Sequence, residues 1–177
     1  MPHLVKQETI ATHAKHFGTR IMVETGTFHG DMCRAMQDHF DRIHTIELSE
    51  PLFAAACKRF KNNTTVNCLQ GDSGVKIKDV LDKLDEPALF WLDGHYSAGP
   101  TARADLDTPI SQELEHVLAH HIQDHVILID DARCFTGENG YPELEQLRKH
   151  LLGQRPDWSF EIETDCIRFT PPKLGNA

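Results

Sequence analysis

The sequence predicts an α/β fold with a doubly wound, mostly parallel sheet and helices on both faces. Three observations indicate this fold. The 177 residues, 40% hydrophobic and 25% charged, match one globular domain rather than a disordered, collagenous or coiled-coil chain. Short apolar runs alternate along the chain with segments of helical spacing. Each apolar run ends in a polar or glycine-rich turn, as buried parallel strands do. We therefore treat residues 1–177 as a single domain.

Strands and helices are predicted in regular alternation. The apolar runs predict five strands, at residues 20–24, 42–48, 65–69, 88–92 and 126–129. Helical spacing predicts five helices, at residues 31–40, 50–60, 73–84, 108–121 and 141–152. Pro51 suits the first turn of the second helix, and Ser73 is the expected N-cap of the third. We assign no element to the residues before the first strand.

The end of the chain predicts an antiparallel pair. Residues 158–164 and 166–170 have the composition of two strands, joined by a tight turn at Asp165. The longest irregular segment, residues 96–107, directly follows the fourth predicted strand. Loops of that length in compact domains are usually functional or mobile, so we expect this segment to contribute to a site.

The charge and the cysteine content indicate which partners and which cellular compartment to expect. The chain has 27 acidic and 18 basic side chains, a net charge of −9, and no basic run, so we expect neither a nucleic-acid nor a membrane partner. The five cysteines form no CxxC pair and predict reduced thiols. No segment has the apolar length of a signal core or a membrane span. We therefore expect a cytoplasmic protein.

The unusual residues gather at the predicted carboxyl ends of the strands, where open α/β sheets bind ligands. The first strand runs into Glu24-Thr-Gly26-Thr-Phe-His-Gly30, a turn in which Gly26 lets a ligand approach the backbone. The middle glycine of the dinucleotide fingerprint GxGxxG is missing, which disfavours an NAD enzyme. Glu47, at the end of the second strand, is placed to accept hydrogen bonds from both hydroxyls of a ribose. The alternative is a plain turn and a solvated glutamate.

In this order, these motifs resemble the class I S-adenosylmethionine (SAM)-dependent methyltransferases over nearly the whole chain. The first turn resembles the glycine-rich motif of that family, Glu47 its ribose-binding acid, and Gly71-Asp72-Ser73 its adenine-contacting motif. The resemblance implies a seven-stranded sheet with an antiparallel C-terminal hairpin. It implies that Glu24 and Gly26 hold the methionine moiety and that Asp72 with Ser73 holds the adenine edge. The implied cofactor site also contains Thr27, Phe28, Gly30, Leu48 and Asp93.

Asp93 and the pair Asp130-Asp131 suggest a metal site. They follow the fourth and fifth strands, which in the sheet order of the family are neighbours roughly 4.8 Å apart. Crowded carboxylates repel one another, and Mg²⁺ or another hard divalent cation relieves that repulsion. This arrangement is similar to the metal-dependent O-methyltransferases of the catechol and macrolide-sugar types, whose metal chelates the acceptor hydroxyls. His95 is the best-placed general base, alongside Asp93 as a catalytic residue. The alternative is that the aspartates are turn and helix-capping residues.

The chain also departs from those enzymes. Asp131 stands where catechol-type enzymes have an asparagine, and their additional N-terminal helices have no counterpart in the predicted elements. We expect the acceptor site to come from residues 96–107, from residues 133–140 or from a second subunit of a homo-oligomer. Arg103 and Arg133 are candidates for holding an acidic or phosphorylated acceptor.

Other residues are expected to be structural. His116, His120, His121 and His125 have a spacing that can bind zinc, but a solvated helix end is the better interpretation. Glu113 and Glu115 of the same helix could approach the acidic residues, but a surface position is the preferred interpretation, and Trp91 is predicted to be a core residue. Cys134 is a candidate reactive thiol without an identifiable histidine partner.

These observations predict a SAM-dependent methyltransferase that methylates an oxygen of a small acceptor, with sugars among the candidates, assisted by Mg²⁺. One alternative is a metal-dependent transferase, mutase or hydrolase that acts on a nucleotide-sugar or phosphorylated substrate with the same fold. A second alternative is a non-catalytic module that binds the cofactor.

Overall fold

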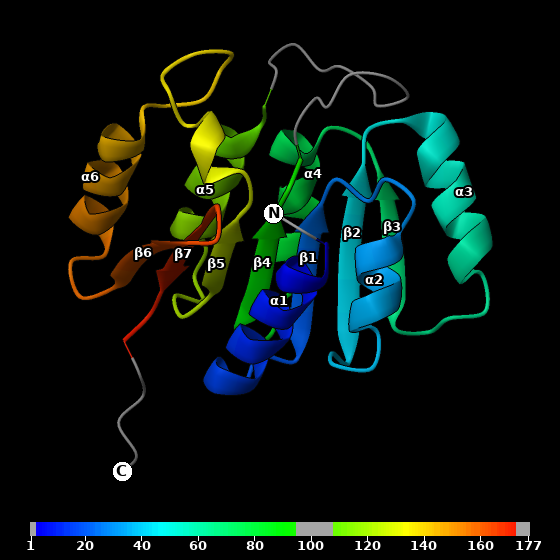
Figure 1. The fold of residues 1–177 in the computed structure, drawn as a ribbon. Helices are drawn as coiled ribbons and strands as arrows, with labels where there is room; N and C mark the ends of the chain where they lie inside the picture. Colours follow the sequence, from blue (N-terminus) through cyan, green and yellow to red (C-terminus); the bar gives the residue numbers. More distant parts are fainter. Residues whose placement is uncertain (1–2, 95–107, 173–177) are drawn as a thin grey trace.

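The computed structural model describes residues 3–94 and 108–172 (Figure 1). The helices in the described part are α1 (His3–Phe17), α2 (Asp31–Met36), α3 (Glu50–Phe60), α4 (Ser73–Leu81), α5 (Ile110–Ala119) and α6 (Leu144–Gln154), with a 3-10 turn η1 (Ala132–Cys134). The strands are β1 (Ile21–Thr25), β2 (Arg42–Glu47), β3 (Val66–Gln70), β4 (Ala88–Leu92), β5 (Val126–Ile129), β6 (Ser159–Glu163) and β7 (Cys166–Thr170). No helix in these ranges is long and apolar enough to span a bilayer.

The predicted fold class is confirmed. The strands form a seven-stranded sheet in the order β3-β2-β1-β4-β5-β7-β6. β1 to β5 are parallel, whereas β7 runs antiparallel to β5 and β6. Thr164 and Asp165 both have positive φ in the turn between β6 and β7, as a two-residue hairpin turn requires. The order reverses between β1 and β4, which is the position where this type of sheet binds ligands.

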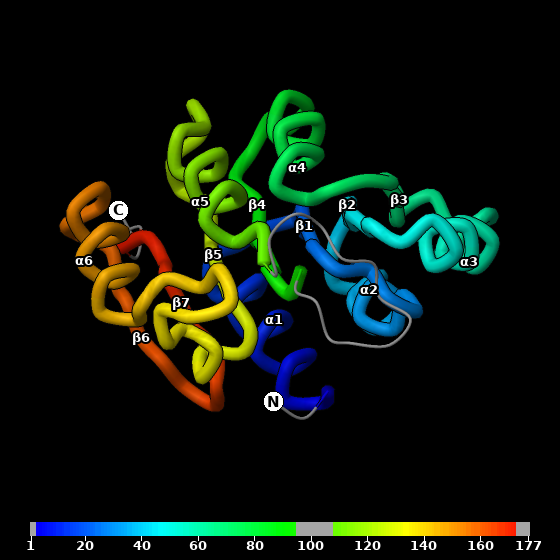
Figure 2. The backbone as a smooth tube through the Cα atoms, turned by 90° about the horizontal axis from the view of Figure 1, so that it is seen from above, coloured from blue at the N-terminus to red at the C-terminus, as the bar shows by residue number. Residues whose placement is uncertain are grey.

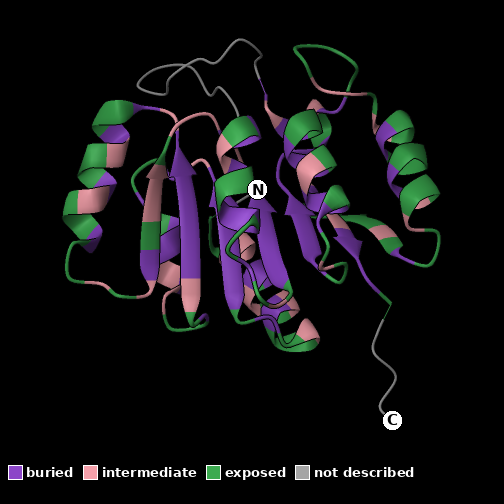
Figure 3. Ribbon diagram, turned by 180° about the vertical axis from the view of Figure 1, so that it is seen from behind, coloured by how far each residue is buried: buried purple, intermediate pink, exposed green. Residues whose placement is uncertain are grey.

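Helices cover both faces of the sheet, and the period-2 alternation of the strands divides the core between the faces. Helices α1, α2 and α3 lie on one side and α4 and α5 on the other (Figure 2). Met22, Leu89 and Trp91 face the first side, and Val23 and Phe90 face the second. The central strands are buried along their length (Figure 3), and Trp91 is a core residue as predicted.

Helix α1 was not predicted, because its sequence carries little apolar periodicity. Its buried residues are Thr9, Ile10 and Ala14, which form no continuous apolar stripe, and Leu4 is exposed. The helix forms against the starts and centres of β4 and β5, where Ile10 and Ala14 join the core cluster around Trp91. Tertiary packing and not local propensity determines this element.

Most predicted boundaries were correct to within one or two residues, with larger shifts at the helix ends. The helix predicted at residues 31–40 ends at Met36, and the one at residues 73–84 ends at Leu81. α5 begins only at Ile110 and α6 only at Leu144. The expected capping serine was wrong: Asp72 is the N-cap of α4, and its Oδ1 accepts a hydrogen bond from the Gly74 amide at 2.9 Å.

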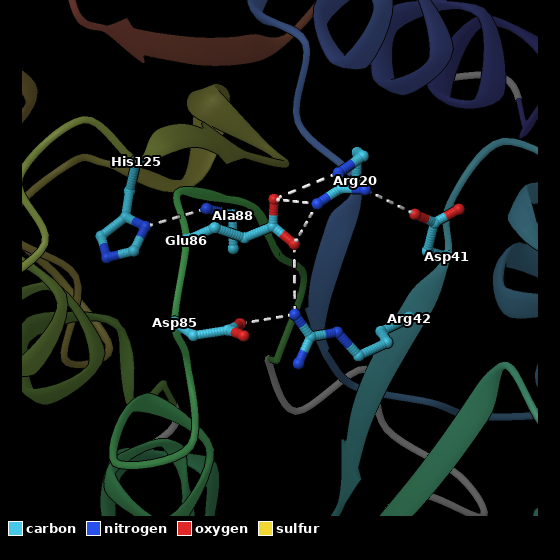
Figure 4. A network of polar contacts seen from close by, with 7 residues as sticks. All are labelled: Arg20, Asp41, Arg42, Asp85, Glu86, Ala88 and His125. Carbon is cyan, nitrogen blue, oxygen red and sulfur yellow. Dashed lines mark hydrogen bonds and ion pairs between the residues drawn. The ribbon is translucent and has the colours of Figure 1, made fainter.

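Charged side chains join the amino ends of the strands, opposite the predicted site (Figure 4). Arg20 makes a forked contact with Glu86 at 3.0–3.2 Å, and Arg42 bridges Asp85 at 2.5 Å and Glu86 at 3.1 Å. Because the arginines are largely exposed, we expect each ion pair to contribute little to the stability of the fold. The network fixes the register of the loop before β4 more than it stabilises the fold.

Beside this network, two histidines expected at a solvated helix end are buried. The Ala88 amide donates to His125 Nδ1 at 3.0 Å, so His125 Nε2 carries the proton and donates to His120 Nδ1 at 2.9 Å. Both rings are at most 9% exposed, whereas His121 is exposed. Burial, followed by the neighbouring His120, lowers the pKa of His125 to about 4. The pair is a neutral structural element at the end of α5.

We predict that His125 makes the fold sensitive to acid. Its folded pKa of about 4 lies below the usual 6.5, so its stabilising contribution is present above pH 6.5 and is lost as the pH falls through 4. The full loss is about 3 kcal/mol. Urea unfolding at several pH values between 7 and 4 gives the free energies of unfolding of the wild type and of His125→Gln. The loss is measured as the change with pH in the difference between these two free energies. Buried Glu24 and Glu113 have the opposite pH dependence, but they are common to both proteins.

His121→Gln is the matched control for this prediction, because His121 is exposed. Its difference from the wild type should stay constant over the same pH range. A constant difference for His125→Gln as well would contradict the buried neutral pair.

Candidate functional site

The turn after β1 lies directly against the end of β4. Gly26 has a φ of +86°, and a Cβ atom there would lie 2.7 Å from the Asp93 carbonyl oxygen. Gly30, before α2, has a φ of +76°, and a Cβ atom there would lie 2.7 Å from the Phe60 ring of α3. Only glycine permits both the backbone conformation and these approaches. The turn 26–30 is therefore held at the switch point of the sheet, as the sequence predicted.

Glu47 orders that turn from β2. Its Oε2 accepts a hydrogen bond from the Phe28 amide at 2.8 Å, and its Oε1 accepts one from the Ser49 amide at 2.9 Å. Each oxygen has a second lone pair, so the carboxylate can still accept from a diol. Phe28 is held at a φ of +50° and is 43% exposed, an apolar side chain presented at the edge of the turn. Leu48, the next residue along the chain, is half-buried.

Glu24 lies beneath the turn rather than at its surface. Its Oε2 accepts hydrogen bonds from Thr45 Oγ1 at 2.6 Å and from Cys33 Sγ at 2.9 Å, and Thr27 Oγ1 lies 2.6 Å from the same threonine hydroxyl. Burial raises the pKa of Glu24 to about 7 despite these bonds. Glu24 therefore shapes the turn from below, and its predicted contact with the methionine moiety stays a prediction.

Glu113 of α5 is buried on the other face of the sheet, so the preferred prediction of a surface residue was wrong, and it lies beside the acidic residues, as the alternative had it. It is 1% exposed, its Oε1 has no hydrogen-bond partner in the described part of the chain, and burial raises its pKa to about 7. Ser73 opens α4 beside Asp72, which completes the predicted adenine motif next to the turn. The sequence did contain a signal for this burial: Glu113 lies four residues before Val117, which places both on the same face of α5.

The predicted acidic residues do meet. Asp93, Asp130 and Asp131 each offer a carboxylate oxygen within 4.8 Å of the others. The Asp130 side chain is fully buried, and its Oδ1 has no hydrogen-bond donor in the described ranges. Burial, and then the Asp93 charge, raises the pKa of Asp130. We call these three residues the acidic centre. Three carboxylates, one of them with a buried oxygen that has no donor, are suitable ligands for a hard divalent cation.

An ammonium group that sequence reasoning missed lies against the acidic centre. Lys6 of α1 pairs with Asp93 Oδ2 at 3.0 Å and with Asp130 Oδ2, and its Nζ lies 5.8 Å from the centre of the Trp91 ring. Burial alone would lower the pKa of Lys6, but the two carboxylates outweigh it and raise the pKa. Because α1 was not predicted, neither was this contact.

The remaining predicted residues are placed as follows. Arg133 of η1 pairs with Asp131 at 2.7 Å and with Asp165 of the β6–β7 turn, so it connects the acidic centre to that turn. A cavity beside the centre is lined by Thr108, Glu113 and Tyr141, as well as by Asp93 and Asp130. Burial raises the pKa of the predicted reactive thiol of Cys134, which disfavours its thiolate. His95, Arg103 and the rest of the segment 96–107 lie outside the described residues, which resume at Thr108.

Solved structures share this architecture. The SAH-bound methyltransferase PaMTH1 of Podospora anserina is 15% identical, with a TM-score of 0.68 over 97% of this chain and 80% of its own. An O-methyltransferase of Bacillus cereus in complex with SAH is 14% identical, with a TM-score of 0.68 over 96% and 82%. The O-methyltransferase TomG of Streptomyces achromogenes, involved in tomaymycin synthesis and solved with SAM, is 15% identical, with a TM-score of 0.66 over 97% and 82%. The sequence matches no family model and no curated protein.

The chain has the class I methyltransferase fold. At these identities the likeness establishes the fold, and the chemistry must be argued from the residues. Within the methyltransferase fold, the turn 26–30 and Glu47 lie at the switch point, and the acidic centre lies one strand further along the sheet.

We predict that Gly26→Ala destabilises the protein more than Gly18→Ala. Gly18 also has a positive φ, +67°, but a Cβ there meets nothing within 4 Å, so this control measures the backbone strain alone, about 1–2 kcal/mol. Gly26→Ala adds the clash with the Asp93 carbonyl, which forces the ends of β1 and β4 apart. Urea unfolding of both variants gives the comparison. Equal losses would show that the turn does not depend on this approach.

Proposed function

We propose that the protein is a SAM-dependent methyltransferase that transfers the methyl group to an oxygen of a small hydroxylated acceptor beside a divalent cation. The observation that carries the proposal is the double position of Asp93. Its backbone lies against the turn at Gly26, whereas its carboxylate belongs to the acidic centre. A donor held by the turn and an acceptor held at the acidic centre would therefore be neighbours.

The cofactor side is supported by the residues of the turn. Glu47 keeps lone pairs available for the two ribose hydroxyls while backbone amides hold it in place. Asp72 and Ser73 open α4 at the adjacent strand end, where an adenine edge would lie. The fold neighbours solved with SAM or SAH support the same cofactor.

The acceptor side is supported by the acidic centre and its cavity. Asp93, Asp130 and Asp131 are the residues that would hold the cation, which when bound lowers the pKa of an acceptor hydroxyl and orients its oxygen. Thr108 and Tyr141 line the adjoining cavity, whose volume of about 10 Å³ would have to widen before their hydroxyl groups could meet a polar acceptor. The acceptor oxygen forms a bond to the methyl carbon as the carbon–sulfur bond breaks, and the hydroxyl proton leaves to a base. We assign that base to His95, which follows Asp93 by two residues in sequence.

The cofactor is tested by thermal unfolding with SAM, SAH or NAD. A ligand at about 100 times its Kd adds about 2.7 kcal/mol, which for this chain length raises the Tm by roughly 5–10 °C. We expect that shift with SAM and SAH, no shift with NAD, and loss of the shift in Glu47→Ala. Glu50→Ala, an exposed residue at the start of α3, is the control and should keep it. No shift with either sulfur compound would reject the methyltransferase and favour a metal-dependent enzyme for nucleotide-sugar or phosphorylated substrates.

The metal site is tested by titrating the protein with Mn²⁺, a spectroscopic substitute for Mg²⁺. Asp130→Asn should weaken Mn²⁺ binding by at least about 10-fold, because even the outer partners of metal ligands contribute 10–100-fold. Asp124→Asn, on the exposed loop before β5, is the matched control and should bind as the wild type does. Unchanged binding in Asp130→Asn would move the site elsewhere.

A further inference from the structure

Lys6 makes α1 part of the acidic centre. Its ammonium group contacts Asp93 Oδ2 and Asp130 Oδ2, oxygens of two of the three carboxylates of the centre. The Lys6 side chain is 18% exposed and lies against the Trp91 ring, so it is held in the protein and not in solvent. In this arrangement the ammonium takes the position that a shared metal ion would need.

One buried oxygen of the acidic centre has no donor. Asp130 Oδ1 is fully buried and accepts no hydrogen bond in the described part of the chain, whereas Asp130 Oδ2 faces Lys6. A buried anionic oxygen beside two further carboxylates is a suitable ligand for a hard divalent cation.

The anchoring of α1 shows what would move. The apolar contacts of the helix are made by Ile10 and Ala14, whereas His3, Leu4 and Glu8 are exposed. Among the described residues, Lys6 makes the ion pairs that join the first turns of α1, where Val5 and Gln7 are only half-buried, to the strand ends, while the later turns are held by the core. Loss of the Lys6 contact would release residues 3–8 and leave residues 9–17 in place.

We propose that Lys6 and a divalent cation compete for Asp93 and Asp130, so that metal binding displaces Lys6 and releases the first turns of α1. The inference depends on the metal site of the proposed function but not on SAM binding or methyl transfer. Lys6 is the internal counter-cation of the metal-free centre, and it sets how strongly the centre binds metal.

The test compares Mn²⁺ affinity in the wild type, Lys6→Met and Lys15→Met, without SAM. Methionine keeps the length and apolar stem of lysine but removes the charge, and Lys15 is an exposed lysine of the same helix. We expect Lys6→Met to bind Mn²⁺ at least about 10-fold more tightly than the wild type, and Lys15→Met to bind as the wild type does. Lys6→Arg keeps the positive charge and should bind Mn²⁺ as weakly as the wild type does. It replaces Lys6→Met in the comparison if Lys6→Met does not fold.

Hydrogen exchange of the wild type gives the second measurement. Saturating Mg²⁺ should speed exchange of the amides of residues 7–12, which donate to the carbonyls of residues 3–8, and leave the amides of residues 13–17 unchanged. Equal or weaker Mn²⁺ binding in Lys6→Met, or an α1 that keeps its protection with metal bound, would overturn the competition while leaving the metal site intact. No Mn²⁺ binding by any variant would overturn both, whereas the thermal shift with SAM reports on the cofactor separately.

Discussion

Repulsion among Asp93, Asp130 and Asp131 is the constraint on which the arrangement of the site depends. The strand order places β4 and β5 side by side, so the carboxylates that follow them must share one edge of the sheet. Carboxylates crowded and buried in this way require cations. Lys6 of α1 and Arg133 of η1 are two of these cations, and Arg133 also pairs with Asp165 in the β6–β7 turn. The N-terminal helix and the C-terminal hairpin are thus both attached to the same centre.

A second constraint is that polar groups support the glycine turn from beneath. Glu24 on the α2 side and Glu113 on the α5 side flank the end of β1, and burial raises the pKa of each to about 7. Glu24 accepts hydrogen bonds from Thr45 and Cys33, whereas Glu113 Oε1 has no hydrogen-bond partner in the described part of the chain. Burying a carboxyl group costs stability unless it is hydrogen-bonded. We infer that Glu24 is retained because its directional bonds fix the turn in a way that apolar contacts do not.

Much of this could be predicted from the sequence, because the informative residues are local. The alternation of apolar runs gave the strand positions, and the residues directly after each strand gave the turn, Glu47 and the acidic centre. Contacts made over long sequence distances could not be predicted. Lys6 lies 87 residues from Asp93, in a helix with no apolar stripe, and nothing near it in sequence indicates a partner. The burial of Glu113, His120 and His125 likewise depends on where α5 packs.

The departure of this chain from the catechol-type enzymes has a physical explanation in these contacts. Asp131 in place of an asparagine adds one negative charge to a centre that already contains two aspartates. Arg133 lies two residues further along the chain and pairs with that added carboxylate, and Lys6 pairs with the other two. The substitution and the two cations therefore form one unit. Of the two cations, Arg133 accompanies the added carboxylate, whereas Lys6 faces the other two. Because Arg133 lies two residues from Asp131 and Lys6 lies on α1, the first pairing is set by the local sequence and the second by where the N-terminal helix packs.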